Sequence, residues 1–159
     1  MLPSAPAGAD EIGNLLDKYR IAWHRLRPNW VDDYPYVPEA RFRLAASGNK
    51  LLADYEVSED NVRAVTPEDN GKVWEDSCCE LFLQPGDGHY YNFECNCAGR
   101  LLIGCGKGRN DREAAPQSVS DTVKRYASLG SKPFDTRKQS EPWRLSLIIP
   151  TTALFKDTV

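Results

Sequence analysis

A tryptophan and three polar side chains are spaced so that they could bind a ligand rich in hydroxyl groups. Trp74 stands just before a run of alternating residues that contains Glu80, and the next such run contains Glu94 and Asn96. Carboxylates and amides form hydrogen bonds with hydroxyl groups, and an indole offers a flat apolar surface to the C–H face of a sugar ring. This combination indicates a site for a polyhydroxylated ligand.

Two neighbouring strands are predicted to position these side chains. They span residues 77–84 and 90–97, and the Pro-Gly-Asp-Gly run at 85–88 between them is a strong turn signal. Because side chains alternate across a strand, each strand has two different faces. One face contains Cys79, Leu81, Leu83, Tyr91, Phe93, Cys95 and Cys97, and the other contains Glu80, Phe82, Gln84, Asn92, Glu94 and Asn96. We expect the first face to pack on a core and the second to point outward.

Most of the remaining chain predicts further short strands. A hairpin is predicted at 39–46 and 50–57, and further strands at 124–129 and 142–149, where apolar and polar residues alternate. Residues 10–18 have helical spacing and predict one short helix. Many short strands with little helix are typical of an all-β fold, and we expect a mainly antiparallel, jelly-roll-like β-sandwich.

The connecting segments predict minor elements. Residues 19–26, 62–65 and 101–103 favour short strands, and residues 130–140 favour a loop. The glycine-rich run at 104–109 lacks the G-x-x-x-x-G-K-[ST] pattern of a phosphate-binding loop, so we expect a surface loop there.

Composition limits the domain organisation and the partners. The 159 residues predict one domain at 9–159 after a disordered tail at 1–8. The net charge of −3, without a long basic run, argues against nucleic acid as a partner. No apolar run approaches the roughly 20 residues that span a bilayer, which argues against a membrane. Residues 1–8 lack the pattern of a secretion signal, which favours a cytoplasmic location.

Cysteine usage favours buried thiols rather than a metal centre. The chain has five cysteines, and several fall within the predicted strands. We expect small buried apolar side chains in a reducing compartment. A zinc site built on Cys95 and Cys97 would need a second pair of ligands at suitable spacing, and His24 and His89 are too isolated in sequence to supply it.

Residues 74–82, with the sequence WEDSCCELF, closely resemble the W-(E)-x-D-S-x-E-x-F strand of family 9 carbohydrate-binding modules. Weaker similarity to the family-9-like proteins of gut bacteria runs from about Ile21 to the last residue. Its segments are Asn29-Trp30, Tyr34-Pro35-Tyr36, residues 90–97, Lys124-Arg125-Tyr126 and residues 143–150. The resemblance implies a β-sandwich that binds a saccharide without catalysis.

The resemblance also implies roles for individual residues. In these modules two tryptophans sandwich a sugar ring, and charged and amide side chains bind its hydroxyls. Trp74 matches the first tryptophan, Glu80 matches a strand carboxylate, and Asn96 matches a sugar-binding amide. Glu59 or Asp60 stands where the module has another sugar-binding acid.

Two departures from the family pattern affect the expected site. Glu94 stands where the modules have an arginine, so the ligand or its orientation is expected to differ. The second tryptophan of the family lies near the C-terminus, beyond the last residue of this chain. The resemblance therefore implies a sandwich truncated at the C-terminus or completed by a partner chain, and a homodimer would provide such a partner.

Family 9 modules often hold calcium, so the acidic residues were considered as ligands for that ion. They are Glu59, Asp60, Glu68, Asp69, Glu75 and Asp76. Their spacing does not match an ordered calcium loop, so we expect solvated acids and no bound metal. Asp76 and Glu75 are the candidate ligands if the chain does bind calcium. Asp76 is alternatively a loop-capping acceptor at the strand entrance.

Alternative functions remain open from sequence. Trp74 either stacks on a sugar or packs at the sheet edge, and Trp23, Trp30 and Trp143 are expected to pack in the core or at an edge. The chain could be a structural or interaction domain that has lost its sugar site. A glycoside hydrolase would need two carboxylates at a gap of about 5 Å or about 6.5–9.5 Å, and Glu80 and Glu94 could supply that pair.

Overall fold

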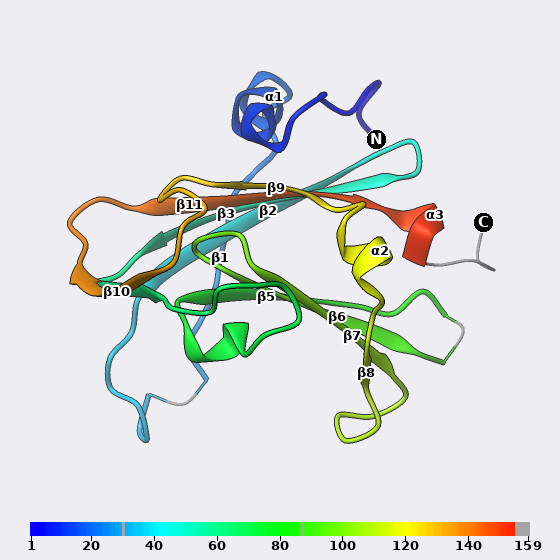
Figure 1. Ribbon diagram of the computed structural model, residues 1–159. Coiled ribbons are helices and arrows are strands. Elements are labelled where there is room, and N and C mark those ends of the chain that lie inside the picture. Colours follow the sequence, from blue (N-terminus) through cyan, green and yellow to red (C-terminus); the bar gives the residue numbers. More distant parts are fainter. Residues whose placement is uncertain (30, 87, 155–159) are drawn as a thin grey trace.

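Two β-sheets pack face to face in the computed structural model, with a helix on the outer face of one of them (Figure 1). The structure describes residues 1–29, 31–86 and 88–154. Trp30 and Asp87, which carried part of the resemblance and part of the predicted turn, therefore lie outside the described residues. The sheets are antiparallel throughout the described pairings, which confirms the predicted β-sandwich.

The larger sheet has five strands in the order β1-β2-β3-β11-β9. Its strands are β1 (His24–Arg25), β2 (Glu39–Ser47), β3 (Lys50–Ser58), β11 (Trp143–Pro150) and β9 (Lys124–Ala127). The hairpin of β2 and β3 was predicted from its alternation and its glycine turn, and β11 pairs with β3 over its full length.

The smaller sheet has four strands in the order β5-β6-β7-β8, and two further strands pair beside it. Its strands are β5 (Cys78–Leu83), β6 (Tyr90–Asn96), β7 (Leu101–Gly106) and β8 (Glu113–Ala114), and the separate pair is β4 (Asn61–Ala64) with β10 (Phe134–Lys138). The predicted hairpin of residues 77–84 and 90–97 therefore forms β5 and β6.

Helical segments are short and lie at the ends of strands or over a sheet. They are η1 (Ala9–Glu11), α1 (Ile12–Lys18), η2 (Val73–Glu75), α2 (Gln117–Ser120) and α3 (Thr151–Leu154). The helix predicted at residues 10–18 corresponds to η1 and α1. Its apolar side packs with Leu52 and Ile148 on the outer face of the larger sheet.

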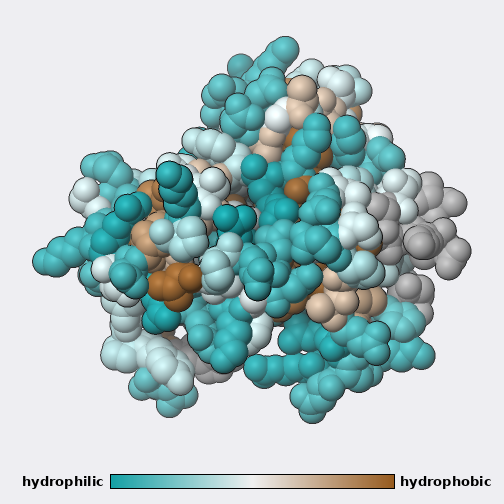
Figure 2. All heavy atoms as spheres, viewed as in Figure 1, coloured by the Kyte–Doolittle hydropathy of each residue, from teal (hydrophilic) through white to brown (hydrophobic). Residues whose placement is uncertain are grey.

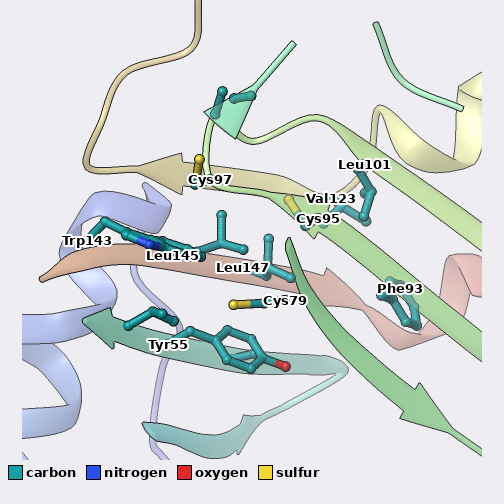
Figure 3. Packing of buried hydrophobic residues seen from close by; sticks show 14 of the residues in the cluster. Tyr55, Cys79, Phe93, Cys95, Cys97, Leu101, Val123, Trp143, Leu145 and Leu147 are labelled. Carbon is teal, nitrogen blue, oxygen red and sulfur yellow. The ribbon is translucent and has the colours of Figure 1, made fainter. Parts of the chain in front are cut away.

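The main core lies between the two sheets, where the predicted apolar faces meet (Figure 3). Cys79, Cys95 and Cys97 are buried there as free thiols, as expected from their positions in the strands. Burial raises the pKa of Cys95 and of Cys97 to about 12, so these thiols stay protonated at neutral pH. Trp143 is also buried in this core, and its Nε1–H donates to Glu59 Oε1 over 2.7 Å.

Charged side chains lie beneath α1 and hold it against the larger sheet. Asp54 Oδ2 accepts from Arg43 Nε over 2.9 Å and from an Arg144 guanidinium nitrogen over 2.8 Å, while Oδ1 accepts from Ser146 Oγ over 2.8 Å. Arg43 also donates to the carbonyl oxygen of Gly13 in α1 over 3.0 Å. We call Arg43, Asp54, Arg144 and Ser146 the buried charge network.

The indole of Trp23 covers the same network. The guanidinium carbon of Arg43 lies 4.2 Å from the ring centroid, and that of Arg144 lies 5.7 Å away. A weakly hydrated guanidinium packs well on an aromatic face. Trp23 therefore packs at the outer face of the larger sheet, in agreement with its predicted packing role.

Several sequence predictions were wrong in detail. Residues 130–140 are not a loop throughout, because β10 pairs there with β4. The strand predicted at 19–26 is reduced to β1, and the surface loop predicted at 104–109 begins inside β7. Residues 1–8 include an ordered contact instead of forming only a free tail, since Leu2 is buried and its N–H donates to the Ala46 carbonyl over 2.7 Å.

The face of the molecule in Figure 2 is mostly hydrophilic, with apolar side chains in scattered patches. Within the described ranges, no helix is long and apolar enough to cross a membrane. The same residues contain no group of three or more His, Cys, Asp or Glu side chains placed to hold a metal ion.

Candidate functional site

A pocket of about 930 Å³ lies on the outer face of the smaller sheet, and we call it the Trp74 pocket. Its lining comes from η2, from all four strands of the smaller sheet and from the segment that leads into β8. The lining residues are Trp74, Glu80, Phe82, Tyr90, Asn92, Glu94, Leu102, Gly104, Arg109, Arg112, Glu113 and Ala114. The pocket thus contains three of the six predicted ligand-binding residues, namely Trp74, Glu80 and Glu94.

Strand register explains why the floor of this pocket is polar. Glu80 on β5 is directly opposite Glu94 on β6, and Phe82 is opposite Asn92. Side chains opposite each other in an antiparallel pair have Cβ atoms about 4.5–5.5 Å apart on one face. The two carboxylates therefore lie side by side, with Asn92 two residues from Glu94 on the same side of β6.

Glycines on β7 make room for Arg112 beside this floor. Gly104 is opposite Asn92, and Gly106 is opposite Tyr90, so neither position adds a side chain to the outer face. A Cβ at Gly106 would lie 2.8 Å from Arg112 Cα, a distance that real Cβ atoms do not show. Glycine at this position therefore lets the segment before β8 approach β7 closely.

Trp74 stands at the rim of the pocket on η2. Its neighbour Val73 is fully buried and anchors the turn, while Trp74 itself is 50% exposed. Trp74 therefore adds a half-exposed indole to the lining of the pocket. The alternative prediction, a tryptophan packed at the sheet edge, stays open, because half of the side chain is buried.

Asp76 fixes the segment that carries Trp74. Its carboxylate accepts from the N–H groups of Val65 and Thr66 over 2.9 and 3.1 Å, and from Asn96 Nδ2 over 2.9 Å. Burial of the carboxyl opposes ionisation, but these hydrogen bonds outweigh burial and hold the pKa of Asp76 below its ordinary value. Asp76 is therefore the predicted loop-capping acceptor.

Glu75, the other candidate calcium ligand, is exposed and lies 3.3 Å from Lys72 Nζ. The oxygens of Asp76 accept three hydrogen bonds, whereas Glu75 pairs with a lysine on the surface, so the two candidate ligands lie in different surroundings.

Glu94 lies at the floor in a perturbed environment. Burial raises its pKa, the charge of Glu80 raises it further, and Arg112, Arg109 and Asn92 partly offset the rise. Asn92 Nδ2 donates to Glu94 Oε1 over 2.5 Å, and Arg112 lies 3.8 Å from the same oxygen. Glu94 Oε2 and Asn92 Oδ1 are buried without a hydrogen-bond partner among the described residues.

Arg109 and Arg112 line the pocket from the end of the glycine-rich run predicted as a surface loop and from the residues directly after it. The resemblance placed an arginine where Glu94 stands, and the structure brings a guanidinium next to Glu94 from a different element. Gly104 and Gly106 on one side of β7 permit this approach, but no local pattern in the sequence identifies the segment that approaches.

Asn96 does not line the pocket. It is fully buried, its Nδ2 donates to Asp76, and its Oδ1 accepts from the N–H groups of Ala98 and Arg100 over 3.1 and 2.8 Å. The predicted sugar-binding amide therefore holds the turn after β6, because its position at the end of the strand places it beneath the capping loop.

Glu59 and Asp60 lie at a different hollow of about 330 Å³, next to Tyr36. Glu59 accepts the Trp143 indole N–H, and the N–H of Asp60 donates to the Tyr36 hydroxyl over 2.7 Å. The turn after β3 carries both residues toward the segment at 36–39 instead of toward η2, so they do not line the Trp74 pocket.

The fold and the site together define a β-sandwich binding protein with an aromatic, carboxylate-lined pocket on one sheet. The model of carbohydrate-binding family 9 matches residues 10–159, and the chain belongs to this family.

A solved structure from Bacteroides uniformis ATCC 8492, provisionally assigned as a carbohydrate-binding protein, is 46% identical to this chain. It superposes with a TM-score of 0.91, and the match covers 100% of this chain and 73% of that one. A search of curated proteins found no match. The family and the solved structure support carbohydrate binding as the general function.

Proposed function

We propose that the protein binds a saccharide without catalysis in the Trp74 pocket. One sugar ring stacks on the Trp74 indole, and its hydroxyls form hydrogen bonds with Glu80 and Glu94. The observation that carries the proposal is the half-exposed indole at the rim of a pocket with paired carboxylates on its floor.

Physical chemistry favours weak and reversible binding. Aromatic contacts contribute about 0.5–1.5 kcal/mol beyond the area that they bury, and each net hydrogen bond contributes a similar amount. The pocket is open and its cations are matched by carboxylates, so the affinity should depend little on salt.

The direct test is a titration with xylo- and gluco-oligosaccharides that follows tryptophan emission. We expect a saturable change at millimolar sugar or below in the wild-type protein, and its loss in Trp74→Ala. Trp23→Phe is the matched control, because Trp23 lies on the other sheet among arginine side chains. The absence of any response, or an unchanged response in Trp74→Ala, would refute the proposal.

Catalysis is tested separately with chromogenic glycosides. The proposal predicts that no product is released, since it assigns Glu80 and Glu94 to hydrogen bonding. Release of product that disappears in Glu80→Gln would instead establish a glycoside hydrolase.

A second candidate function is self-association through the segment between β1 and β2. The exposed apolar side chains of this region are Leu26, Val31, Tyr34, Tyr36 and Val37. Exposed apolar surface is a common feature of protein interfaces, and this segment has several exposed apolar side chains. Light scattering that gives a stable dimer mass, reduced to the monomer in Tyr34→Ser, would support this candidate, and a monomer at all concentrations would exclude it.

A further inference from the structure

A second exposed aromatic side chain lies in the Trp74 pocket. Phe82 on β5 lines the pocket and is 58% exposed, which is more than Trp74 itself. Its neighbours in the strand, Leu81 and Leu83, point the other way and pack against the main core. A single exposed apolar side chain is common on a protein surface, so the position of this ring inside a pocket is what requires an explanation.

Tyr90 holds the Phe82 ring from the neighbouring strand. Phe82 is opposite Asn92 on β6, so Tyr90 is its diagonal neighbour on the same face. The centroids of the two rings lie 6.1 Å apart, and the ring planes are tilted by 39°. The guanidinium carbon of Arg112 lies 5.8 Å from the Tyr90 centroid. Tyr90 is therefore a positioning residue for Phe82, while more than half of the Phe82 side chain is left open to solvent.

Trp74 and Phe82 are attached at different ends of the pocket floor. The cap that carries Trp74 is tied to the start of β5, because Asp76 accepts from Asn96, which is opposite Cys78. A strand rises by about 3.2–3.4 Å per residue, so Phe82 lies about 13 Å further along β5 than Cys78. The two aromatic side chains therefore serve different positions along the strands.

The volume of the pocket agrees with a ligand longer than one sugar ring. At about 930 Å³ it is near the upper end of the range of about 300–1,000 Å³ that is usual for sites of drug-sized ligands. The row of Glu80 and Glu94 lies between the attachment of Trp74 and the row of Phe82. A ligand that contacts both aromatic side chains thus runs along β5 and β6.

We infer that Phe82 stacks on a second sugar ring, so that the pocket takes at least two consecutive rings of an oligosaccharide chain. The inference rests on the proposed function, in which the first ring stacks on Trp74. It adds a subsite along the strands instead of a second wall over the same ring, and it makes Phe82 the residue that sets the preference for chain length. An aromatic contact of this kind raises affinity by about two- to tenfold beyond the effect of the buried area.

A titration that compares chain lengths tests the inference. The probes are glucose, cellobiose and cellohexaose, with xylose, xylobiose and xylohexaose as a second series, and amide chemical shifts report weak as well as tight binding. We expect the wild-type protein to bind the disaccharide of the better series at least about fivefold more tightly than its monosaccharide.

Phe82→Ala removes the second ring and leaves Trp74 in place. In this variant we expect the disaccharide and the hexasaccharide to bind about three- to tenfold more weakly, and the monosaccharide to keep its wild-type affinity. Phe82→Tyr keeps the flat ring and should restore the affinities, whereas Phe82→Leu should bind as Phe82→Ala does. Tyr126→Ala is the matched control, because it removes an exposed aromatic side chain from β9 of the larger sheet and should leave every affinity unchanged. Urea unfolding verifies that the variants are folded.

The outcomes distinguish the two claims. If binding depends on Trp74 but Phe82→Ala weakens the binding of no probe, the inference is overturned and the proposed function stands. Equal affinities of the wild-type protein for monosaccharide and disaccharide, or equal losses for both in Phe82→Ala, have the same consequence. If the wild-type protein binds no probe of either series, the proposed function fails and the inference fails with it.

Discussion

Both sheets carry carboxylates on their outer faces, but the two faces surround them differently. Asp54 lies beneath α1, and both of its oxygens accept hydrogen bonds from the buried charge network. Glu94 lies in the open Trp74 pocket, and one of its oxygens has no partner among the described residues. The difference separates a carboxylate whose two oxygens both hold the fold together from one that leaves an acceptor unpaired.

The outer face of the larger sheet, which α1 covers, also has buried polar atoms without hydrogen-bond partners. Arg41 Nε and Arg144 Nε are buried without partners there, although other nitrogens of each guanidinium are paired. The unmet groups of the Trp74 pocket are acceptors on two neighbouring side chains. What distinguishes the pocket is therefore the kind of group without a partner, since these atoms are acceptors and those of the covered face are guanidinium nitrogens.

The largest effect is expected from Asp54→Ala. Removing this carboxylate leaves the Arg144 guanidinium without its counter-ion and leaves Arg43 with only the exposed Asp17 as a partner, which should lower the free energy of unfolding by about 3–5 kcal/mol. Urea denaturation measures it. Glu56→Ala, on the same strand and face, removes a more exposed pair with Arg41 and should cost only about 0–1 kcal/mol. Equal effects of the two variants would show that Asp54 stabilises the fold no more than an exposed ion pair does.

The next effect concerns the cap that holds Trp74 in place. Asp76→Asn replaces an accepting oxygen with a donor and should lower the free energy of unfolding by about 1.5–3 kcal/mol. Glu75→Gln, one residue earlier and exposed, should change it by no more than about 0.5 kcal/mol.

Acid denaturation tests the same cap through its pKa. The folded-state pKa of Asp76 lies below its ordinary value of 3.8, and that of Asp69 is lowered as well, where bonds from Arg125, Leu101 and Gln117 outweigh burial. Their stabilising contributions are complete above about pH 4 and disappear as the pH falls through the folded-state pKa values. Unfolding midpoints of the wild-type protein should therefore fall steeply below about pH 4, and less steeply in Asp76→Asn. If the midpoints of the wild-type protein and of Asp76→Asn fell in parallel with pH, Asp76 would not be a source of the acid sensitivity.

The smallest effect should have the opposite sign. The pKa of Glu94 is raised above its ordinary value of 4.5, so its contribution to stability is present below pH 4.5 and is lost as the pH rises through the folded-state pKa. Glu94→Gln relieves the charge opposite Glu80 and should stabilise the protein at neutral pH by about 0.2–1 kcal/mol, with no gain near pH 4. A lower free energy of unfolding for Glu94→Gln at neutral pH would mean that the Glu94 carboxylate stabilises the fold.

Alternation made much of the smaller sheet predictable. The apolar side of β5 and β6 could be read from period-two spacing, and Cys79 and Cys95 lie opposite each other in the core as that spacing requires. In contrast, β10 was missed, because its sequence has exposed charged residues and pairs only with the short strand β4. Such pairing depends on tertiary context that a local pattern does not contain.

The site was predictable only in part for a related reason. Trp74, Glu80 and Glu94 lie within one local segment, so strand periodicity and the resemblance placed them together. Arg112 reaches the same pocket from a loop, through a close approach that Gly106 permits, and no local pattern reveals that contact. Alternation places Asn96 on the same side of β6 as Glu94. Its hydrogen bond to Asp76 nevertheless holds it beneath the capping loop, and alternation alone does not predict that contact.

Chemical-shift mapping tests the contrast between the two faces most directly. Amide spectra of the protein labelled with nitrogen-15 would be recorded during a titration with cellohexaose or xylohexaose. We predict that the signals of Trp74, Glu80 and Glu94 shift and saturate together, while that of Asp54 stays in place. Shifts centred on the residues around Asp54, with those of the Trp74 pocket unchanged, would contradict the assignment of the open face as the ligand site.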